Sequence, residues 1–162
     1  MTKSGSQYFL ASDTIVPMDI KNRILEILEK THLMSLATKD AEGLWVSDVI
    51  FIFDEGLNLY WMSDPDVRHS KTIQANEEVA GTITASIHSK QPNLGIQFSG
   101  VAKKIDGPRY DLALKHLKKR GHLEPKEEDD VLQGDSWYQL TPTKIDLIDE
   151  ENFGYEKRNL TL

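Results

Sequence analysis

The amino-acid sequence predicts a mainly β fold, a small antiparallel barrel with helices at its periphery. Short runs of aromatic and β-branched residues, separated by polar turns, recur along the chain, whereas only three segments have helical spacing. A chain of 162 residues, 39% of them apolar, also has the size and composition of one globular domain with a single core. Short strands with helices before or between them fit a small barrel.

Three helices are predicted from apolar periodicity and from helix-start signals. They span residues 19–30, 64–76 and 107–120. In the second helix, Asp64 is expected to be the N-cap and Pro65 the first helical residue. In the third helix, the pattern places Tyr110, Leu114 and Leu117 on one side.

Strands account for most of the remaining chain. The predicted strands cover residues 32–38, 45–53, 57–62, 79–87, 93–105, 137–140 and 144–148. Polar turns that end in Gly43 and Gly56 join the first three strands, and Pro142 separates the last two. Residues 124–130 are so charged that we expect a solvated loop or an exposed helix. The expected organisation is an extension over residues 1–17, a barrel domain over 18–148 and a polar tail over 149–162.

Composition excludes several classes of function. The net charge of −7 opposes broad binding to nucleic acid or to anionic lipid, so an anionic ligand requires a local basic pocket. The absence of cysteine excludes disulfides, thiolate catalysis and cysteine-based zinc sites. The first 20 residues carry no apolar segment of the kind that a signal peptide needs. We therefore expect a cytoplasmic protein without nucleic-acid or membrane partners.

Signatures of catalysis are sparse. The sequence contains no G-x-G-x-x-G, P-loop or H-E-x-x-H pattern, and its five histidines lack paired metal-ligand spacing, so no metal site is expected. His116 and His122, the closest pair, are expected to be surface histidines. Carboxylates are so numerous that no pair can be chosen for acid–base catalysis. The sequence alone therefore assigns no catalytic acid or base.

One segment, Tyr60–Lys71, has the pattern of a phosphate site. A strand ends at the hydroxyl of Ser63, the chain turns, and a helix begins with Arg68 and Lys71 three residues apart and hence on one face. Free amides at a helix start, together with a guanidinium and an ammonium, suit a phosphate monoester. The same residues also fit an ordinarily capped helix with two exposed cations, and spacing leaves both interpretations open.

Several motifs in a fixed order give the sequence a resemblance to a known superfamily. They are M-S-L-A-T-K-D-x-x-G (Met34–Gly43), Y-W-M-S-D-P-D-V-R-H-S-K (Tyr60–Lys71), A-N-E-E-V-A-G (Ala75–Gly81), G-I-Q-F-S-G (Gly95–Gly100) and W-Y-x-L-T-P (Trp137–Pro142). Over residues 18–148 the chain resembles the FMN-binding split β-barrel superfamily of pyridoxamine 5'-phosphate oxidase-like proteins. Within it, the chain is most similar to a small bacterial branch whose reaction is unassigned. The resemblance implies a split antiparallel β-barrel and a homodimer that binds two FMN molecules at its interface.

The resemblance also implies which residues bind FMN. Ser63 matches a flavin-contacting threonine or serine, and Arg68 matches a phosphate-binding arginine. His69 occupies the usual lysine position, and Lys71 falls where many relatives have a second basic residue. The strand that lines the isoalloxazine ring contributes Ser47, Asp48, Val49 and Ile50, and the other implied contacts are Met62 and Gln97.

Departures from the oxidase pattern limit what the resemblance implies about activity. Ser47 and Ile52 stand where the oxidases have an arginine and a lysine, and the C-terminal R-L-H-x-R signature is missing. We therefore expect an FMN-dependent oxidoreductase that acts on a small molecule, but not a true pyridoxamine 5'-phosphate oxidase. The alternatives are a non-catalytic module that binds flavin, haem or a deazaflavin, and a purely structural dimer. Trp61 and Trp137 are expected to be core or dimer contacts.

Overall fold

The computed structural model describes residues 17–162, so the expected extension over residues 1–17 lies outside the described residues except for Pro17. Four helices are present in this range: α1 (Ile20–Lys30), α2 (Arg68–Ala75), α3 (Tyr110–Lys119) and α4 (Glu150–Phe153). The strands are β1 (Leu33–Asp40), β2 (Gly43–Phe53), β3 (Leu59–Ser63), β4 (Glu78–Thr84), β5 (Leu94–Ile105), β6 (Ser136–Asp149) and β7 (Arg158–Leu160).

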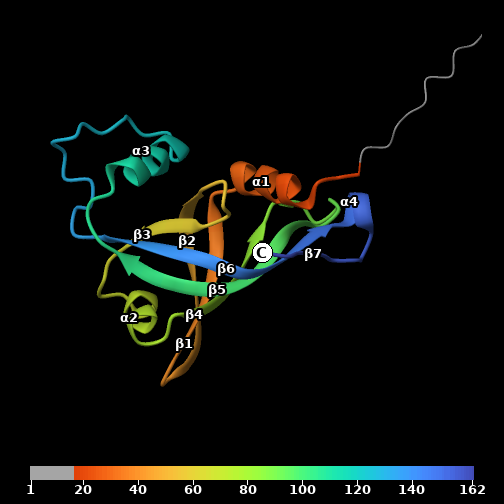
Figure 1. Ribbon diagram of the computed structural model, residues 1–162, viewed down its shortest axis with the longest axis horizontal. Coiled ribbons are helices and arrows are strands. Elements are labelled where there is room, and N and C mark those ends of the chain that lie inside the picture. Colours follow the sequence, from red (N-terminus) through yellow and green to blue (C-terminus); the bar gives the residue numbers. More distant parts are fainter. Residues whose placement is uncertain (1–16) are drawn as a thin grey trace, which may run out of the picture.

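The strands form one antiparallel sheet that closes into a barrel. Their order is β3-β2-β1-β4-β5-β6-β7, and β3 also pairs with β6. Six strands therefore enclose the barrel, while β7 pairs with β6 beyond the closure, at Ile145–Leu147. Helices α2 and α3 lie on opposite sides of the long β5–β6 ribbon (Figure 1). The prediction of a mainly β split barrel with peripheral helices is confirmed.

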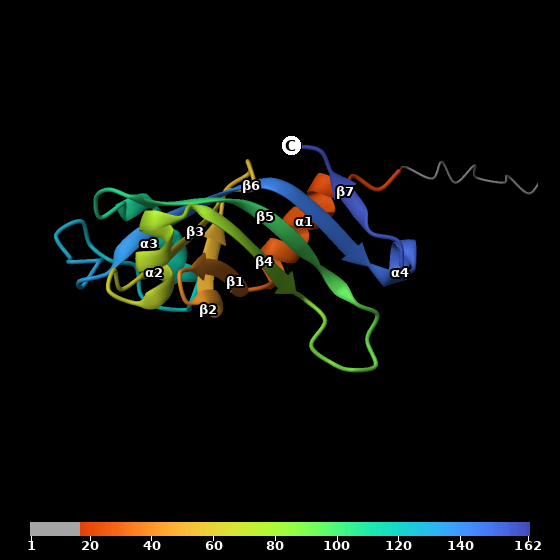
Figure 2. The ribbon, with the colours of Figure 1, turned by 90° about the horizontal axis from the view of Figure 1, so that it is seen from below.

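Two apolar clusters hold the elements together. The larger cluster fills the barrel and includes Trp61, which stacks on Tyr138 with ring centroids 5.5 Å apart, and it extends to the buried face of α1. The smaller cluster packs α3 on the outside of β2, β3 and β6, around Trp137. Both tryptophans are fully buried, so they are core residues as expected. Seen from below, α1 lies along the ribbon (Figure 2), and its last turn meets the end of α3, where Nζ of Lys119 donates to the carbonyl of Leu28 at 3.0 Å.

Helix α3 is rotated from its predicted orientation. Its buried side chains are Leu112, Ala113 and His116, whereas the predicted apolar residues of this helix are half-buried. His116 is only 5% exposed and packs edge-on against Trp137, so the expectation of a surface histidine is wrong. Burial lowers the pKa of His116 to about 4. A helix with apolar residues on more than one face cannot be oriented from spacing alone.

The last two predicted strands are one continuous strand, β6. Pro142 does not end it, because the register between β5 and β6 shifts between Ser99 and Gly100, and Pro142 lies opposite Gly100. A Cβ on Gly100 would lie 2.4 Å from the carbonyl oxygen of Thr141, so glycine permits the close approach of the two strands. Bulges are the positions within a sheet where a residue without an N–H is tolerated.

The predicted polar tail is ordered. It contains α4 and β7, and it returns along the outer end of β6 (Figure 1). Asp149, at the start of this segment, is 1% exposed and accepts a hydrogen bond of 2.7 Å from Nε of Arg23 in α1. The tail therefore packs as part of the domain. Within residues 17–162, no helix has the length and apolar character needed to cross a membrane.

Gly81, in the middle of β4, lies where the barrel leaves no room for a side chain. A Cβ at this position would lie 2.4 Å from the carbonyl oxygen of Ser35 and 2.5 Å from Cζ of Phe98. We expect Gly81→Ala to lower the free energy of unfolding by about 3 kcal/mol, because neither the strand nor the ring can move freely. Ala80 is the neighbouring residue on the exposed face of β4, and Ala80→Ser should change the free energy of unfolding by less than about 0.5 kcal/mol. Urea titration followed by tryptophan fluorescence measures both, and equal effects would contradict this packing.

Candidate functional site

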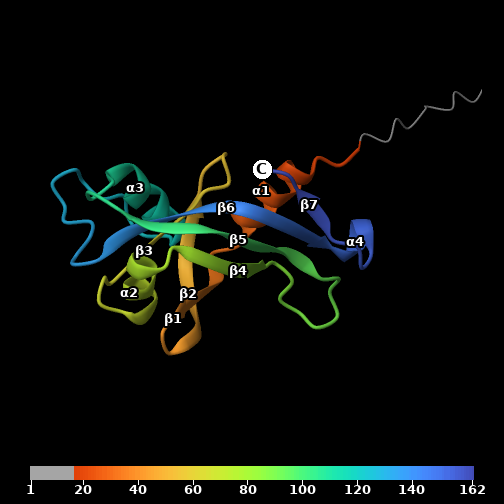
Figure 3. The same ribbon diagram turned by 60° about the horizontal axis from the view of Figure 1, so that its bottom comes forward.

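A groove of about 710 Å³ lies between the β1–β2 turn and α2. The turn contributes residues 39–42 to its wall, and the opposite wall consists of mainly polar side chains from α2 and from the residues just before and after it. Figure 3 shows α2 below the long β5 strand, beside the projecting hairpin of β1 and β2. This groove contains two of the residues expected to bind FMN, Arg68 and Lys71.

Helix α2 begins later than predicted. The carboxylate of Asp64 accepts a hydrogen bond of 2.8 Å from the amide of Asp66, within its own turn, and so does not cap the helix. Val67 is the N-cap, without a side-chain hydrogen bond, and Arg68 is the first helical residue. The predictions for Asp64 and Pro65 are therefore wrong, because Asp64 closes a local turn instead. Arg68 and Lys71 nevertheless keep their spacing of one helical turn.

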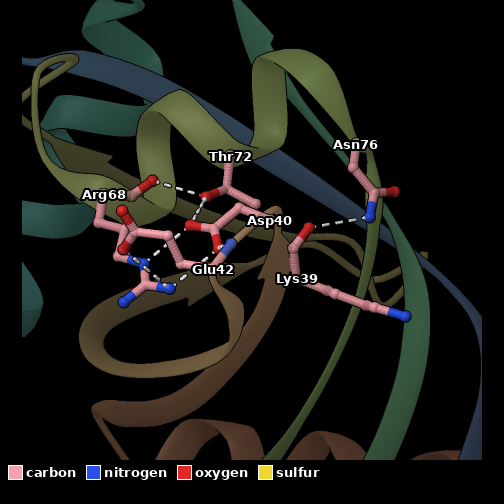
Figure 4. Close-up of polar contacts among 6 residues, drawn as sticks. All are labelled: Lys39, Asp40, Glu42, Arg68, Thr72 and Asn76. Carbon is pink, nitrogen blue, oxygen red and sulfur yellow. Dashed lines mark hydrogen bonds and ion pairs between the residues drawn. The ribbon is translucent and has the colours of Figure 1, made fainter.

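Arg68 is held by the opposite wall of the groove. Its Nε and Nη2 donate to the two carboxylate oxygens of Asp40, at 2.8 and 2.9 Å. Glu42 lies 3.7 Å from Nη2, and the guanidinium carbon is 4.7 Å from the ring centroid of Trp45. Figure 4 shows this pairing between the turn and the helix. The hydrogen bonds from Arg68 lower the pKa of Asp40 to about 2, and the same pairing raises the pKa of Arg68.

Other polar contacts fix the turn along the helix. The hydroxyl of Thr72 donates to the carbonyl of Arg68 at 2.9 Å and lies 3.4 Å from Asp40. One turn further on, the side-chain amide of Asn76 donates to the carbonyl of Lys39 at 3.1 Å (Figure 4). The β1–β2 turn is thus attached to α2 at both ends of the groove.

The charges that line the groove cancel. Lys71 lies 3.5 Å from Asp66, with both side chains exposed, and Arg68 is paired with Asp40. The ionic groups of the groove are Lys39, Arg68 and Lys71 against Asp40, Glu42 and Asp66. An anion that enters the groove therefore meets two cations, Arg68 and Lys71, that already have carboxylate partners. The groove is a set of ion pairs rather than a simple basic pocket.

A hydroxyl–imidazole pair lies beside the groove, at the end of β3. Oγ of Ser63 is 3.0 Å from Nε2 of His69, which is half-buried on the first turn of α2. Burial lowers the pKa of His69, so its imidazole is mainly neutral near pH 7. The pair can donate or accept a hydrogen bond without a formal charge.

The four predicted residues of β2 lie on the strand that pairs with β3, toward the end of β3 that carries Ser63. β2 pairs with β3 at Phe51 and Trp61, and two residues further along the strands are Val49 and Ser63. Val49 is 7% exposed and packs in the barrel core. Ser47 and Ile50 are half-buried, Asp48 accepts a hydrogen bond of 2.6 Å from the hydroxyl of Ser35, and Met62 packs against the α3 cluster. The structure thus brings nine of the ten expected residues to β2, the end of β3 and α2.

Gln97 lies elsewhere on the sheet. It is on β5, and the register Asp48–Ser35–Thr82–Gln97 places β1 and β4 between it and β2. Three strand spacings separate Gln97 from Asp48 by roughly 14 Å. The side-chain oxygen of Gln97 accepts a hydrogen bond of 2.7 Å from Lys157. Within one chain, Gln97 therefore does not meet the group around Arg68.

The partners of Arg68 were not identified from the sequence. Asp40 and Glu42 belong to a polar turn 28 and 26 residues before Arg68, and nothing in a turn composition indicates such a partner. Trp45 is a weak indication of a contact at this turn, because an aromatic residue beside a glycine-ended turn is expected to find a packing partner. Among residues 17–162, no group of three or more histidine and acidic side chains is arranged to hold a metal ion.

The chain has relatives of similar sequence among bacterial proteins. No family model matches the chain. The chain is 29% identical to the UPF0306 protein plu4501 of Photorhabdus laumondii over 87 residues, which cover 53% of the chain and 61% of that protein. It is also 29% identical to the UPF0306 protein YhbP of Salmonella schwarzengrund over 104 residues, 64% of the chain and 71% of that protein.

Solved structures with the same fold carry different descriptions. A pyridoxamine 5'-phosphate oxidase-like protein from Listeria innocua matches 80% of the chain and 98% of its own length with a TM-score of 0.64 and 16% identity. A haem-binding protein from Mycobacterium smegmatis matches 91% of the chain and 60% of its own length, with a TM-score of 0.69 and 17% identity. The haem storage protein HutZ from Vibrio cholerae matches 77% of the chain and 91% of its own length, with a TM-score of 0.59 and 19% identity. The resemblance to pyridoxamine 5'-phosphate oxidase-like split barrels is confirmed, and two of these neighbours are described as haem-binding or haem storage proteins.

The Asp40–Arg68 pair predicts a pH dependence of stability. Because its pKa is lower in the folded state than the ordinary value of 3.8, ionised Asp40 stabilises the fold above about pH 4, and this stabilisation is lost as the pH falls toward 2. The difference in unfolding free energy between wild type and Asp40→Asn should therefore shrink from pH 5 to pH 2.5, as measured by urea titration. Asp66→Asn, on an exposed side chain of the same groove, should follow wild type. A difference for Asp40→Asn that is constant with pH would contradict the pairing.

Proposed function

We propose that this chain is an FMN-binding protein that uses the flavin to oxidise or reduce a small molecule as a homodimer. One observation carries the proposal: the first residue of α2 is Arg68, and it lies beside the Ser63–His69 pair in a barrel of the pyridoxamine 5'-phosphate oxidase-like type. A cation and uncapped helix amides at one end, with neutral hydrogen-bonding groups next to them, suit a ligand with a phosphate and a polar ring system.

The phosphate end would be held by α2. No side chain caps its first turn, so the amides there are available to an acceptor. The guanidinium of Arg68 supplies charge-assisted hydrogen bonds, and the ammonium of Lys71 lies on the same face. Two of the guanidinium N–H groups are committed to Asp40, so a phosphate must share Arg68 with this carboxylate or displace it. Asp40 therefore weakens the binding of a phosphate.

The ring end would lie along β2 and the end of β3. Met62 and Val49 would contribute backbone contacts, while Ser63 and His69 offer an uncharged donor and acceptor. Bound FMN supplies two-electron redox chemistry. The chain's own residues orient it, and the neutral imidazole of His69 can hold a proton at Nε2 near pH 7.

A homodimer is supported by an exposed apolar row on the sheet. Leu44 and Val46 of β2 are 77% and 60% exposed, and Val46 is in register with Ala37 of β1 and then with Ala80 of β4. A sheet face of this composition is suited to association with a second copy. A dimer would also account for the position of Gln97, which would reach a cofactor bound mainly by the other copy.

A non-catalytic binding module is the second candidate function. It is favoured by the descriptions of two neighbours as haem-binding and haem storage proteins. Reduction by a nicotinamide cofactor and reoxidation by a small acceptor, followed at the flavin absorption band, distinguish the two functions. Turnover supports the oxidoreductase, whereas a bound flavin that stays oxidised, or tight binding of haem in place of FMN, supports the module.

Arg68→Ala tests the assignment of the phosphate end. Loss of the guanidinium removes charge-assisted hydrogen bonds, and we expect FMN affinity to fall by at least about tenfold in a fluorescence titration. Arg109→Ala is the matched control, because Arg109 is likewise paired with a carboxylate, that of Asp111, but lies on the other side of the molecule at α3. Equal affinity of Arg68→Ala and wild type for FMN would show that the phosphate lies elsewhere.

Asp40→Asn tests the competition for Arg68. The variant removes a negative charge next to the phosphate position and keeps the size of the side chain. We expect FMN affinity to rise about threefold, and more at low salt. Asp111→Asn makes the same change in net charge at α3 and should leave the affinity unchanged. A lower affinity in Asp40→Asn would mean that Asp40 orients Arg68 for binding rather than competing with the phosphate.

A further inference from the structure

A small apolar cluster attaches α3 to the outside of the barrel. The buried members of this cluster are Ile52, Tyr60, Leu112, Ala113 and Trp137. The loop over residues 120–135 returns from α3 to β6 (Figure 1), and its Val131 and Leu132 pack against the same cluster. This cluster is separate from the core inside the barrel. The attachment of α3 is therefore a local unit of stability.

His116 of α3 is buried in this attachment without a polar partner. Its imidazole is 5% exposed and packs edge-on against Trp137, with ring centroids 5.7 Å apart. Neither of its ring nitrogens has a hydrogen-bond partner among residues 17–162. A neutral imidazole has one N–H group, whereas a protonated one has two and a full charge. Protonation in this position therefore adds an unpaired donor and an unpaired charge to an apolar cluster.

The charges around His116 oppose its protonation. They belong to α3 and the residues after it, and they are those of Lys119, Arg120 and His122. Within the described part of the chain, no carboxylate is among the groups whose charge acts on this imidazole. Burial, reinforced by the three positive groups, lowers the pKa of His116 to about 4.

The strands beneath α3 supply no counter-charge either. The titratable side chain that β3 contributes to the cluster is Tyr60, and its hydroxyl already donates to Asp54, at the end of β2, at 2.9 Å. On β6, Tyr138 belongs to the core inside the barrel. A protonated His116 consequently finds its stabilising partners only in water, that is, after α3 has left the strands.

The same cluster contacts the ring end of the candidate site. Met62 is partly buried against it and is the register partner of Trp137 in the β3–β6 pairing. The residue after Met62 is Ser63, whose hydroxyl lies 3.0 Å from Nε2 of His69. Contiguous contacts thus lead from His116 through Trp137 to the end of β3.

We propose that His116 is an acid-sensitive latch, whose protonation releases α3 and the loop after it from β2, β3 and β6 and thereby loosens the end of β3. Once released, the imidazole binds a proton with the ordinary pKa of 6.5, whereas the attached form has a lower pKa. The neutral imidazole therefore keeps the latch closed above about pH 6.5, and the latch opens as the pH falls toward 4. The effect on flavin binding rests on the proposed function, but the release of α3 does not.

Hydrogen exchange tests the release of α3 in the flavin-free full chain. Exchange is measured at pH 7.5 and 5.0 by pepsin digestion and mass spectrometry, and each rate is divided by the intrinsic rate at that pH. We expect the amides of α3 to lose protection about thirtyfold at pH 5.0, because the released state binds one more proton, while β1 and β5 keep theirs. Equal protection of α3 at the two pH values would overturn the proposal.

Matched variants assign the effect to His116. His116→Leu keeps an apolar side chain without a titratable ring, so α3 should be equally protected at both pH values. His122→Leu removes an exposed histidine three residues after α3 and should behave as wild type. The half-buried His69 is unchanged in both variants. Loss of α3 protection at pH 5.0 in His116→Leu would contradict the latch.

The NMR titration of the wild-type imidazoles needs no variant. At pH 5.5, His116 should still have the chemical shifts of a neutral ring, while those of His122 should be shifted by protonation. An ordinary pKa for both rings would overturn the proposal.

FMN titrations at pH 7.5 and 5.0 test the connection to the candidate site. Affinity should fall about threefold more in wild type than in His116→Leu, because titration of the FMN phosphate and of His69 is common to both proteins. An equal fall would show that the latch does not act on the site. Failure of both proteins to bind FMN at pH 7.5 would contradict the proposed function, whereas the exchange result would still decide the latch.

Discussion

The pairing of β3 with β6 closes the sheet, and the position of each group in the candidate site depends on this closure. Because β3 pairs with β6, its last residue, Ser63, lies at the rim of the barrel. The turn at Asp64 then leads the chain from Ser63 into α2. Helix α2 then lies against the β1–β2 turn, and Arg68 meets Asp40, 28 residues earlier in the chain. One barrel contact thus positions the hydroxyl, the imidazole and the guanidinium together.

The polar groups at this rim are paired with one another. Arg68 is bound by Asp40, Lys71 lies near Asp66, and Ser63 contacts His69. Such pairing keeps the side chains in place and lowers their conformational freedom, but it also means that a phosphate must compete with a carboxylate for the same donors. In the proposed function, affinity for an anionic cofactor would therefore balance orientation against competition, and Asp40, which accepts both hydrogen bonds from Arg68, would contribute to each.

Local chemistry predicted much of the fold, whereas pairings between distant segments were beyond the sequence. The glycine-ended turns at Gly43 and Gly56 and the apolar strands depend on neighbours along the chain, and these predictions are confirmed. The continuity of β6 through Pro142 depends on a register shift opposite Gly100, and the order of the tail depends on Arg23 meeting Asp149. Likewise, the segment Ser63–Lys71 could be recognised, but not the attachment of Arg68 to a remote turn.

The most direct test of the central claim is the visible absorption spectrum of the purified full chain, recorded before and after addition of FMN and passage through a desalting column. A site built from Arg68, Ser63 and His69 predicts flavin bands that stay with the protein and are shifted from those of free FMN. A protein that is colourless and loses all added FMN would contradict the account, and the groove at α2 would then serve a different ligand.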